Sequence, residues 1–415
     1  MKPEHPASDI RGPVLVYDFN ASGHCPGWMY LAAAGFRMAG AEVVACCRTG
    51  DAGVRPWADR LAADGCRVVA MPEGDFCHAG DAAALARREG IQRVFFPNFD
   101  SVVYEMGKRR VRGALDGLDV GGIWLRPELR AEPRGPLRRL VEKLVRSRAN
   151  KLQRKHARAV RNNHRGLADF LPDQRRVARV RLFFTSEAAA RDVGALMLPG
   201  EARMLCDPWL DRCRETREQA RAALDLDPSR VVLLHIGTSR PEKGLDDTCQ
   251  AMLSLAPDAR ERLLLLRVGT VDQRDATQLR RLEQTGAARV IDRHVTEDEL
   301  LRAYAACDRV LLPYRHQKET SGVLVHAAAH DRPVIASDHG WIGKATREHA
   351  MGMLVPHCDT HALAAALDRV ARGQACGWSA DGIRKFAAAN SPDRFRKTLV
   401  DDWLRHTPDP PPTGR

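Results

Sequence analysis

The order of apolar and polar residues divides the chain into short β-rich runs separated by longer stretches with a helical pattern. Six of these runs fall in the first half, at residues 14–19, 42–47, 67–71, 93–96, 122–125 and 181–184. Six more fall in the second half, at 231–236, 262–268, 288–291, 309–313, 333–337 and 352–355. Short strands that alternate with helices are typical of parallel sheets covered by helices on both faces. The pattern therefore predicts an α/β protein with two doubly wound, Rossmann-like sheets.

The length of the chain fits this division. A chain of 415 residues exceeds the usual size of one core, and two domains of roughly 200 residues are expected. Proline and glycine interrupt both patterns near residues 195–210, so we place the first domain at 1–200 and the second at 201–385. The proline-rich tail at 407–415 is expected to be disordered. Doubly wound sheets bind ligands at the carboxyl ends of their strands, so we expect the ligand in a cleft between the two domains.

Composition indicates an intracellular protein rather than a secreted or membrane-spanning one. The 11 cysteines include no CxxC pair, and their odd number does not suit a framework of disulfides, which favours a reducing compartment. The amino-terminal residues lack the apolar core of a signal peptide, and no run approaches 18 apolar residues. We therefore expect a cytoplasmic protein.

The net charge of +12 is concentrated in one segment. Residues 126–181 contain 18 Lys and Arg against 5 Asp and Glu. Within this segment, apolar residues at 137, 140, 141, 144 and 145 have the spacing of an amphipathic helix. We expect the basic segment 137–165 either to lie on an anionic membrane or to be a domain helix with a solvated basic face. Nucleic acid is a less suitable partner, because residues 138–165 contain no aromatic side chain to stack on bases.

Two strand-to-helix connections in the second half could bind an anion. The first, LLHIGTSRPEKGLDD, ends a buried strand at Gly237 and carries Arg240 and Lys243 before the next helix. Small residues allow a phosphate to approach the backbone, and the two cations can neutralise a diphosphate. The alternative is an ordinary turn with solvated charges.

The second connection is LLPYRHQKETSG, a strand followed by a helix that begins with small residues. Unpaired N–H groups of Ser321 and Gly322 at the helix start, together with the helix dipole, form an anion site. Glu319 precedes them and could bind sugar hydroxyls, or could act only as an acid that favours the helix dipole.

The motifs GxxRPEKGLD and, further on, ACDRVLLPY…ETSGVLVHA…RPVIASD resemble the carboxyl-terminal domain of retaining GT-B glycosyltransferases of the large family 4 type, the glycosyl transferases group 1. The resemblance is ordered over residues 231–360 and looser over the first domain. FNASGHCPGWMYLAAAGFRMAGAEVVACC is similar to the family's first strand, glycine loop and first helix. SPDRFRKTLVDDWLRH is similar to its last helix, which the resemblance implies at 386–406 and which crosses back to the first domain.

The resemblance implies a retaining, metal-independent, hexosyltransferase-like enzyme. Its donor would be a nucleotide sugar, a UDP- or GDP-sugar, bound as substrate, and no cofactor is expected. The acceptor would be a sugar or a lipid-linked sugar. In this mechanism the protein stabilises the negative charge that grows on the leaving diphosphate. Asp225 and Asp227 have the spacing of a metal-binding DxD motif, but they lie in a connector, so we expect no metal.

The resemblance also implies roles for individual residues. Lys243 and Arg240 would bind the diphosphate, although the family's arginine directly follows the strand glycine, where this chain has Thr238. Ser321 and Gly322 would donate N–H groups to the distal phosphate, and Glu319 would contact the donor sugar. His326 occupies the position of the family's ribose-binding carboxylate.

In the first domain, Gly23 and His24 follow strand one, where the family's glycine loop approaches donor and acceptor. The family often has a histidine near the fourth strand that contacts the donor sugar, and the resemblance implies Asn98 or Asp100 as its substitute here.

Three alternatives compete with this reading. The chain could be a sugar-nucleotide epimerase or a phosphorylase on the same fold. It could also be a degenerate GT-B protein that binds a membrane or nucleic acid without catalysis. Finally, His326 and His330 are four residues apart on one helix, a spacing that can bind zinc, but no third ligand is evident from the sequence.

Overall fold

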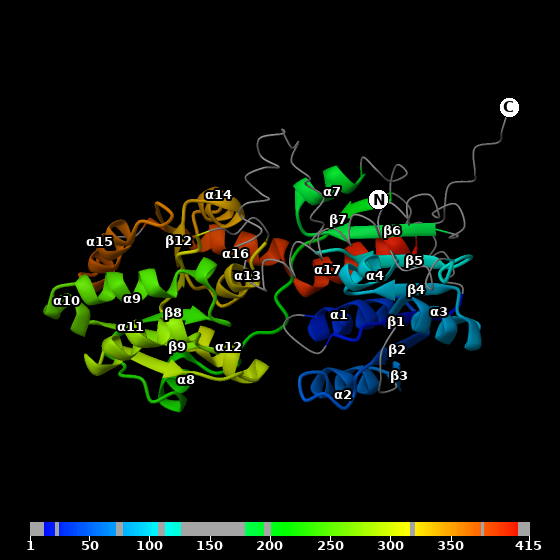
Figure 1. The fold of residues 1–415 in the computed structure, drawn as a ribbon, viewed down its shortest axis with the longest axis horizontal. Helices are drawn as coiled ribbons and strands as arrows, with labels where there is room; N and C mark the ends of the chain where they lie inside the picture. Colours follow the sequence, from blue (N-terminus) through cyan, green and yellow to red (C-terminus); the bar gives the residue numbers. More distant parts are fainter. Residues whose placement is uncertain are drawn as a thin grey trace, which may run out of the picture. The chain divides into compact units, whose positions relative to one another are not determined.

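The computed structural model of the protein describes residues 12–20, 25–71, 78–106, 113–125, 179–194, 201–315, 320–374 and 377–405 (Figure 1). The chain folds into two compact units. The first unit consists of Met1–Leu205 and Phe395–Arg415, and the second consists of Cys206–Arg394. The basic segment 137–165 and the tail 407–415 lie outside the described residues.

The first unit is built on a seven-stranded sheet of order β3-β2-β1-β4-β5-β6-β7, in which all neighbouring strands are parallel. Its strands are β1 (Val14–Tyr17), β2 (Val43–Cys47), β3 (Arg67–Ala70), β4 (Arg93–Phe96), β5 (Asp119–Ile123), β6 (Arg179–Phe184) and β7 (Ala202–Met204). The helices that accompany them are α1 (Cys25–Met38), α2 (Arg55–Ala63), α3 (His78–Arg88), α4 (Phe99–Met106) and α7 (Glu187–Gly194). Strand order reverses between β1 and β4, so connections from these two strands leave on opposite faces.

The carboxyl-terminal segment completes the core of the first unit. Helix α17 (Pro392–Leu399) continues into a π-helical turn, Val400–Leu404, that carries Trp403. The Trp403 ring packs against Phe36 and Phe95 at centroid distances of 5.1 Å, and its Nε1 donates to Asp119 Oδ1 at 3.0 Å. A Cβ on Gly121 would lie 2.7 Å from the Phe95 and Trp403 rings, so β5 needs glycine at this position.

The second unit is built on a six-stranded parallel sheet of order β10-β9-β8-β11-β12-β13. Its strands are β8 (Val231–Ile236), β9 (Leu263–Val268), β10 (Ala288–Ile291), β11 (Arg309–Leu312), β12 (Val334–Ser337) and β13 (Gly352–Val355). Its helices are α8 (Arg217–Ala223), α9 (Leu245–Ser254), α10 (Pro257–Glu261), α11 (Gln273–Gln284), α12 (Glu297–Ala306), α13 (Gly322–Ala329), α14 (Gly340–Glu348), α15 (Thr360–Ala371) and α16 (Ala380–Ala389).

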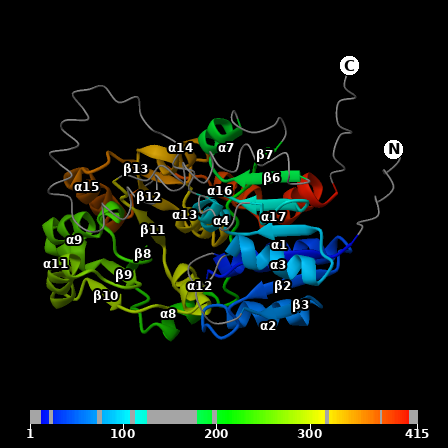
Figure 2. The same ribbon diagram turned by 45° about the vertical axis from the view of Figure 1, so that its right-hand side comes forward.

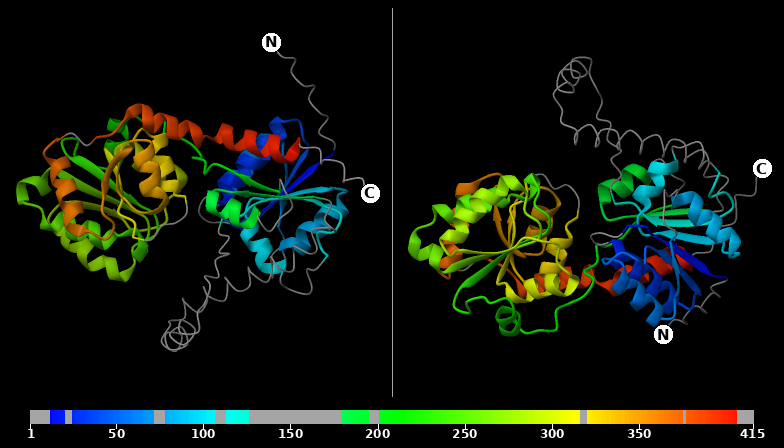
Figure 3. Two further views of the ribbon diagram at one scale, coloured as in Figure 1. Left: turned by 90° about the horizontal axis from the view of Figure 1, so that it is seen from above. Right: turned by 60° about the horizontal axis from the view of Figure 1, so that its bottom comes forward.

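Each face of the second sheet has its own core (Figure 2, Figure 3). Alternate residues of β8 point to opposite faces, with Leu234 in the core that includes α12, α13 and α16 and Leu233 in the core that includes α9, α11 and α15. Strand order reverses between β8 and β11, and the ends of these two strands are where doubly wound sheets generally bind ligands, in a crevice.

The fold class predicted from the sequence is confirmed; several strand limits differ by one to three residues, and one strand was not predicted. Strand β5 begins at Asp119, three residues before the predicted start, because Asp119 and Val120 pair with β4 and β6. Strand β7 was missed, because its three residues lie within the segment predicted to be a break between two patterns. No helix among the described residues is long and apolar enough to cross a membrane.

Candidate functional site

The connection after β8 is shaped around the amine of Lys243. Gly237 follows the strand with φ +103°, a left-handed conformation that favours glycine. A Cβ on Gly237 would lie 2.4 Å from Lys243 Nζ, so the lysine amine occupies the space that a side chain would fill. Lys243 ends a short 3-10 turn, Pro241–Lys243, and its Nζ lies 3.5 Å from the Ile236 carbonyl oxygen. The fold therefore holds the amine over the end of β8.

The charge of Lys243 is only weakly compensated. It forms no ion pair with any carboxylate in the described part of the chain, and it lies partly buried. Burial, followed by the charges of Arg240 and Arg267, lowers its pKa to about 8. Arg240 has an exposed side chain on extended backbone at the start of the turn. An anion beside Lys243 would relieve both the desolvation and the repulsion.

The connections after β8 and β11 are joined to each other. Gly244 has φ 63°, and a Cβ there would lie 2.2 Å from the Pro313 carbonyl oxygen, which follows β11. The Arg315 N–H donates to the Glu242 carbonyl at 2.8 Å, and the Arg315 guanidinium pairs with Asp247 at 2.7 Å. These contacts hold the connection that follows β8 against the connection that follows β11.

The start of α13 is open and polar. Ser321 caps the helix, and its side chain accepts from the Leu324 N–H at 3.4 Å. A Cβ built on Gly322 would meet no atom of the described residues within 4 Å, so those residues leave room for ligand atoms beside the backbone there. Tyr314 hydrogen bonds with the Ser321 side chain, and Lys243 Nζ lies 5.8 Å from the centre of the Tyr314 ring. Tyr314, which sequence reasoning did not single out, thus connects Lys243 with the helix entrance.

A buried acid also contacts this entrance. Asp207, at the start of the second unit, is 8% exposed and hydrogen bonds with the Thr320 side chain. Burial raises the pKa of Asp207 to about 6. No sequence pattern predicts this contact, because the two residues are far apart in the chain.

His326 lies in the second turn of α13 with its ring stacked on Tyr304, at a centroid distance of 5.6 Å. Its Nδ1 is buried and has no hydrogen-bond partner in the described ranges. Burial lowers the pKa of His326 to about 3, so the imidazole is neutral at physiological pH. An ordinary imidazole pKa would make any contribution of His326 to donor binding vary between roughly pH 5.5 and 7.5, whereas the lowered pKa predicts no such variation.

His330 is committed to structural hydrogen bonds. Its Nε2 accepts from the Cys213 N–H at 3.1 Å, so Nδ1 carries the proton and donates to the His326 carbonyl at 2.8 Å. Both ring nitrogens are occupied, which argues against a zinc site at this pair. Within the described segments, no group of three or more His, Cys, Asp or Glu side chains is placed to hold a metal ion.

Three residues predicted to form the site, Glu319, Gly23 and His24, lie outside the described residues. Asp100 and Asn98 are the two residues predicted to replace the family's sugar-binding histidine in the first domain. Asp100 accepts a hydrogen bond from the Leu125 N–H at 2.9 Å and so fixes the chain after β5 to the start of α4. Asn98 is a partly buried residue immediately before α4.

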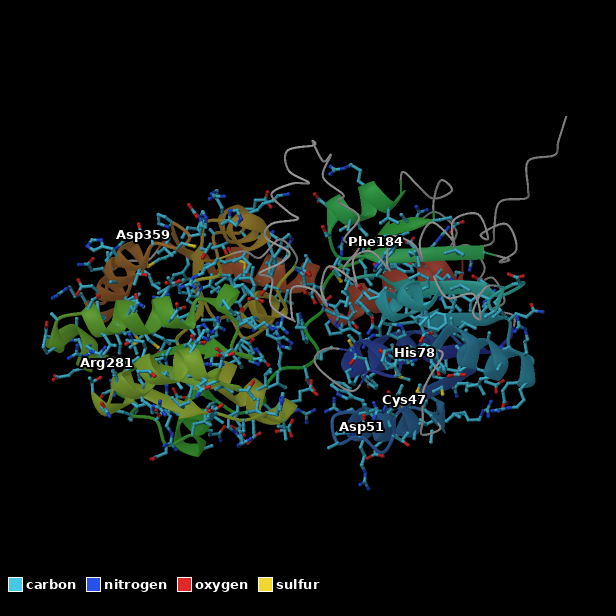
Figure 4. The ribbon with its side chains drawn as sticks, in the orientation of Figure 1. Cys47, Asp51, His78, Phe184, Arg281 and Asp359 are labelled. Carbon is cyan, nitrogen blue, oxygen red and sulfur yellow. The ribbon has the colours of Figure 1, made fainter. Side chains whose placement is uncertain are left out.

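The first unit contains a buried carboxyl that sequence reasoning missed. Asp18 directly follows β1 and is 3% exposed. Its Oδ1 accepts from the Asn20 N–H at 2.9 Å, whereas no described residue hydrogen bonds to its Oδ2. Burial raises the pKa of Asp18 to about 7. His78 begins α3 in the first unit (Figure 4). The ring of Phe19, the residue after Asp18, stacks on the His78 ring at a centroid distance of 3.5 Å, which joins the chain after β1 to the start of α3.

Comparisons with known proteins agree with this architecture. Residues 230–372 match the sequence profile of the family Glycosyl transferases group 1. The structure of Anabaena Alr3699/HepE in complex with UDP-glucose superposes with a TM-score of 0.64 at 12% identity, covering 94% of this chain and 98% of that one. The fold is therefore that of the GT-B glycosyltransferases. The resemblance predicted from the sequence is confirmed at this level: the chain has the GT-B fold, and residues 230–372 within the second unit match the group 1 glycosyltransferase family.

Curated relatives match part of the chain. The D-inositol 3-phosphate glycosyltransferase of Saccharomonospora viridis is 32% identical over 204 residues, which cover 46% of this chain and 47% of the relative. The GDP-mannose:glycolipid 4-beta-D-mannosyltransferase of Xanthomonas campestris is 35% identical over 109 residues, 25% of this chain and 29% of the relative. The chain spans about half the length of the first of these relatives and less of the second.

Proposed function

We propose that the protein is a glycosyltransferase that moves a sugar from a nucleotide-sugar donor, a UDP- or GDP-sugar, to a hydroxyl of a sugar or lipid-linked acceptor. The observation that carries the proposal is the site in the second unit. The weakly compensated amine of Lys243 lies over Gly237, and Tyr314 connects it with the open, polar start of α13. A diphosphate has the charge to pair with this amine and the acceptor oxygens to bind the N–H groups at the helix start.

The same geometry supports a division of roles along the donor. Lys243 binds the diphosphate, and exposed Arg240 adds positive charge at the mouth of the turn. The N–H groups of Ser321 and Gly322 bind the distal phosphate. His326, four residues after Gly322, contacts the ribose with a neutral imidazole. Glu319 contacts the donor sugar, as the resemblance implies.

The reaction is then a retaining, metal-independent transfer. As the bond between sugar and phosphate breaks, negative charge accumulates on the leaving diphosphate, and fixed donors stabilise that charge. One such donor typically contributes about 3 kcal/mol to the transition state, or about a hundredfold in rate. The leaving phosphate accepts the proton of the acceptor hydroxyl, so no side chain with a special pKa is required at that step.

The acceptor side of the proposal is supported by the basic segment and by one relative. The mannosyltransferase of X. campestris acts, by its name, on a glycolipid. Residues 138–165 carry 11 Lys and Arg and one acidic residue, which suits an anionic membrane surface. We expect the protein to cosediment with vesicles that contain anionic lipid, to be released at high salt, and to remain in solution with neutral vesicles. Equal sedimentation with both vesicle types would contradict this assignment.

Thermal unfolding with a panel of nucleoside diphosphates and nucleotide sugars tests the donor class. A ligand present at 100 times its Kd adds about 2.7 kcal/mol to the free energy of unfolding, which raises the Tm measurably. We expect UDP or GDP, and one of their sugars, to raise it while nucleosides do not.

For the donor that binds, product NMR reads the anomeric configuration, and activity after chelation with EDTA tests independence from metal. Inversion of the anomer, or activity that returns only with a divalent cation, would contradict the proposed mechanism. Binding without turnover with any acceptor would favour a non-catalytic nucleotide-binding protein.

A further inference from the structure

Arg267 is a fully buried arginine beneath the proposed diphosphate site. It lies in β9, and its side chain is 0% exposed. Its Nη2 donates to the carbonyl oxygens of Gly237 at 2.6 Å and Thr270 at 3.0 Å. Its Nη1 donates to the carbonyl oxygen of His235 at 3.3 Å and to that of Val268. One guanidinium thus binds backbone from the ends of both β8 and β9.

The charge of Arg267 has no direct counter-ion. It forms no ion pair in the described part of the chain, although Asp275 and Asp292 act on it from a longer distance. Burial lowers the pKa of Arg267 to about 10, so it stays protonated at neutral pH. Its charge is also one of the causes that lower the pKa of Lys243. A buried cation paired only with carbonyl oxygens leaves a positive field at this edge of the sheet.

A second buried arginine in the same unit provides a contrast. Arg221 is 5% exposed, and its Nε donates to the Ala306 carbonyl at 2.9 Å and its Nη1 to the Pro228 carbonyl at 3.0 Å. It holds the amino-terminal edge of the sheet in the way that Arg267 holds the carboxyl-terminal edge. Arg221, however, forms an ion pair with Asp308. Of these two buried arginines, only Arg267, which lies behind Gly237 and Lys243, has no ion pair among the described residues.

We propose that Arg267 is a positioning residue for the donor diphosphate, acting in two ways. Its hydrogen bond to the Gly237 carbonyl fixes the left-handed turn over which Lys243 lies. Its uncompensated charge adds to the field that attracts the diphosphate and holds the pKa of Lys243 low until an anion arrives. This inference rests on the proposed function for its ligand, but its effect on Lys243 can be measured without any nucleotide.

The test separates charge from hydrogen bonding with two substitutions. Arg267→Gln keeps hydrogen-bond donors and removes the charge, whereas Arg267→Lys keeps the charge and cannot reach four carbonyls. Arg221→Gln is the matched control for loss of a buried arginine. Three quantities are measured for each variant: the UDP affinity by calorimetry, the pKa of Lys243 by NMR of ¹³C-labelled lysine, and the Tm. The Lys243→Ala variant identifies the NMR signal of Lys243.

We expect Arg267→Gln to weaken UDP binding by about tenfold or more, the usual range for loss of a charged interaction, and to raise the pKa of Lys243. Arg267→Lys should leave the pKa of Lys243 low and recover part of the affinity. Arg221→Gln should lower the Tm while UDP affinity stays within about twofold, because its contacts lie at the opposite edge.

Two results would overturn the inference. One is an unchanged Lys243 pKa in Arg267→Gln. The other is an Arg267→Gln variant whose Tm falls as much as that of Arg221→Gln while its UDP affinity equals that of the parent. Arg267 would then have only a structural role. If the parent itself binds neither UDP nor GDP, the proposed function fails, whereas the Lys243 titration still decides the coupling between Arg267 and Lys243.

Discussion

The pKa of Lys243 makes nucleotide binding depend on pH in a way that can be worked out from the structure. In the free protein, burial and the charges of Arg240 and Arg267 lower this pKa from 10.5 to about 8. A diphosphate beside the amine stabilises the charged form, so the pKa of Lys243 in the complex is higher. UDP affinity is then fully present below pH 8 and is lost as the pH rises from there toward the pKa of the complex.

The size of the effect follows from the two pKa values. If binding restores the ordinary pKa of 10.5, affinity falls by about eightfold between pH 7.5 and pH 9, and never by more than tenfold per pH unit. At pH 8, binding takes up about half a proton per UDP, since the amine is half protonated before binding and fully protonated afterwards. Calorimetry in two buffers of different ionisation enthalpy measures both quantities.

Substitution of the lysine assigns the effect to this residue. In Lys243→Met the UDP affinity should be lower at every pH, and it should no longer fall between pH 7.5 and pH 9. Any pH dependence that remains in this variant measures the ionisation of the nucleotide itself and can be subtracted. Lys385→Met, an exposed lysine on α16, should behave like the parent. Two results would refute the assignment of Lys243 to the diphosphate. One is an equal UDP affinity of the parent protein at pH 7.5 and pH 9, and the other is a fall in affinity over this range that is as large in Lys243→Met as in the parent.

Three further predictions address the other groups of the two units. Asp18 has its pKa raised from 3.8 to about 7, so the folded state loses stability as the pH rises through this range, by up to roughly 4 kcal/mol. Asp18→Asn should therefore raise the Tm at pH 8 and change it little at pH 4, and an equal change at both values would contradict the burial argument. His326→Glu should tighten UDP binding by about tenfold if a charged hydrogen bond to the ribose is gained, as measured by calorimetry; a lower Tm with unimproved affinity would exclude His326 as the ribose ligand. Glu319→Gln should change the preference among donor sugars more than it changes UDP affinity, because an amide keeps the shape and loses the charge; parental kinetics with every donor would leave Glu319 as a residue that only favours the helix dipole.

Much of the fold could be predicted from the sequence, because most strands of these parallel sheets are short, largely apolar runs. Strands β4, β8, β10 and β13 have the predicted limits. Strand β7 could not be found, since three residues next to a proline and a glycine carry too little pattern. It becomes a strand only through pairing with β6.

The site was predictable where its chemistry is local in sequence. The loop with Lys243 and the small residues at the start of α13 are short motifs whose backbone geometry follows from glycine, serine and the helix terminus. Contacts between distant segments left no such signal. Arg267 appears in the sequence as one charge in an apolar strand, and its four carbonyl partners depend on the register of β8 and β9. Asp207 and Thr320 meet only in the folded unit.

Turnover of a nucleotide sugar tests the central claim most directly. Release of UDP or GDP from the donor that raises the Tm would be measured for the parent, for Lys243→Ala and for the control Lys385→Ala. We expect the parent and Lys385→Ala to turn over donor at the same rate, and Lys243→Ala to be slower by about a hundredfold or more with an unchanged fold. Activity of Lys243→Ala within threefold of the parent would contradict the account, because the diphosphate would then be bound and stabilised elsewhere.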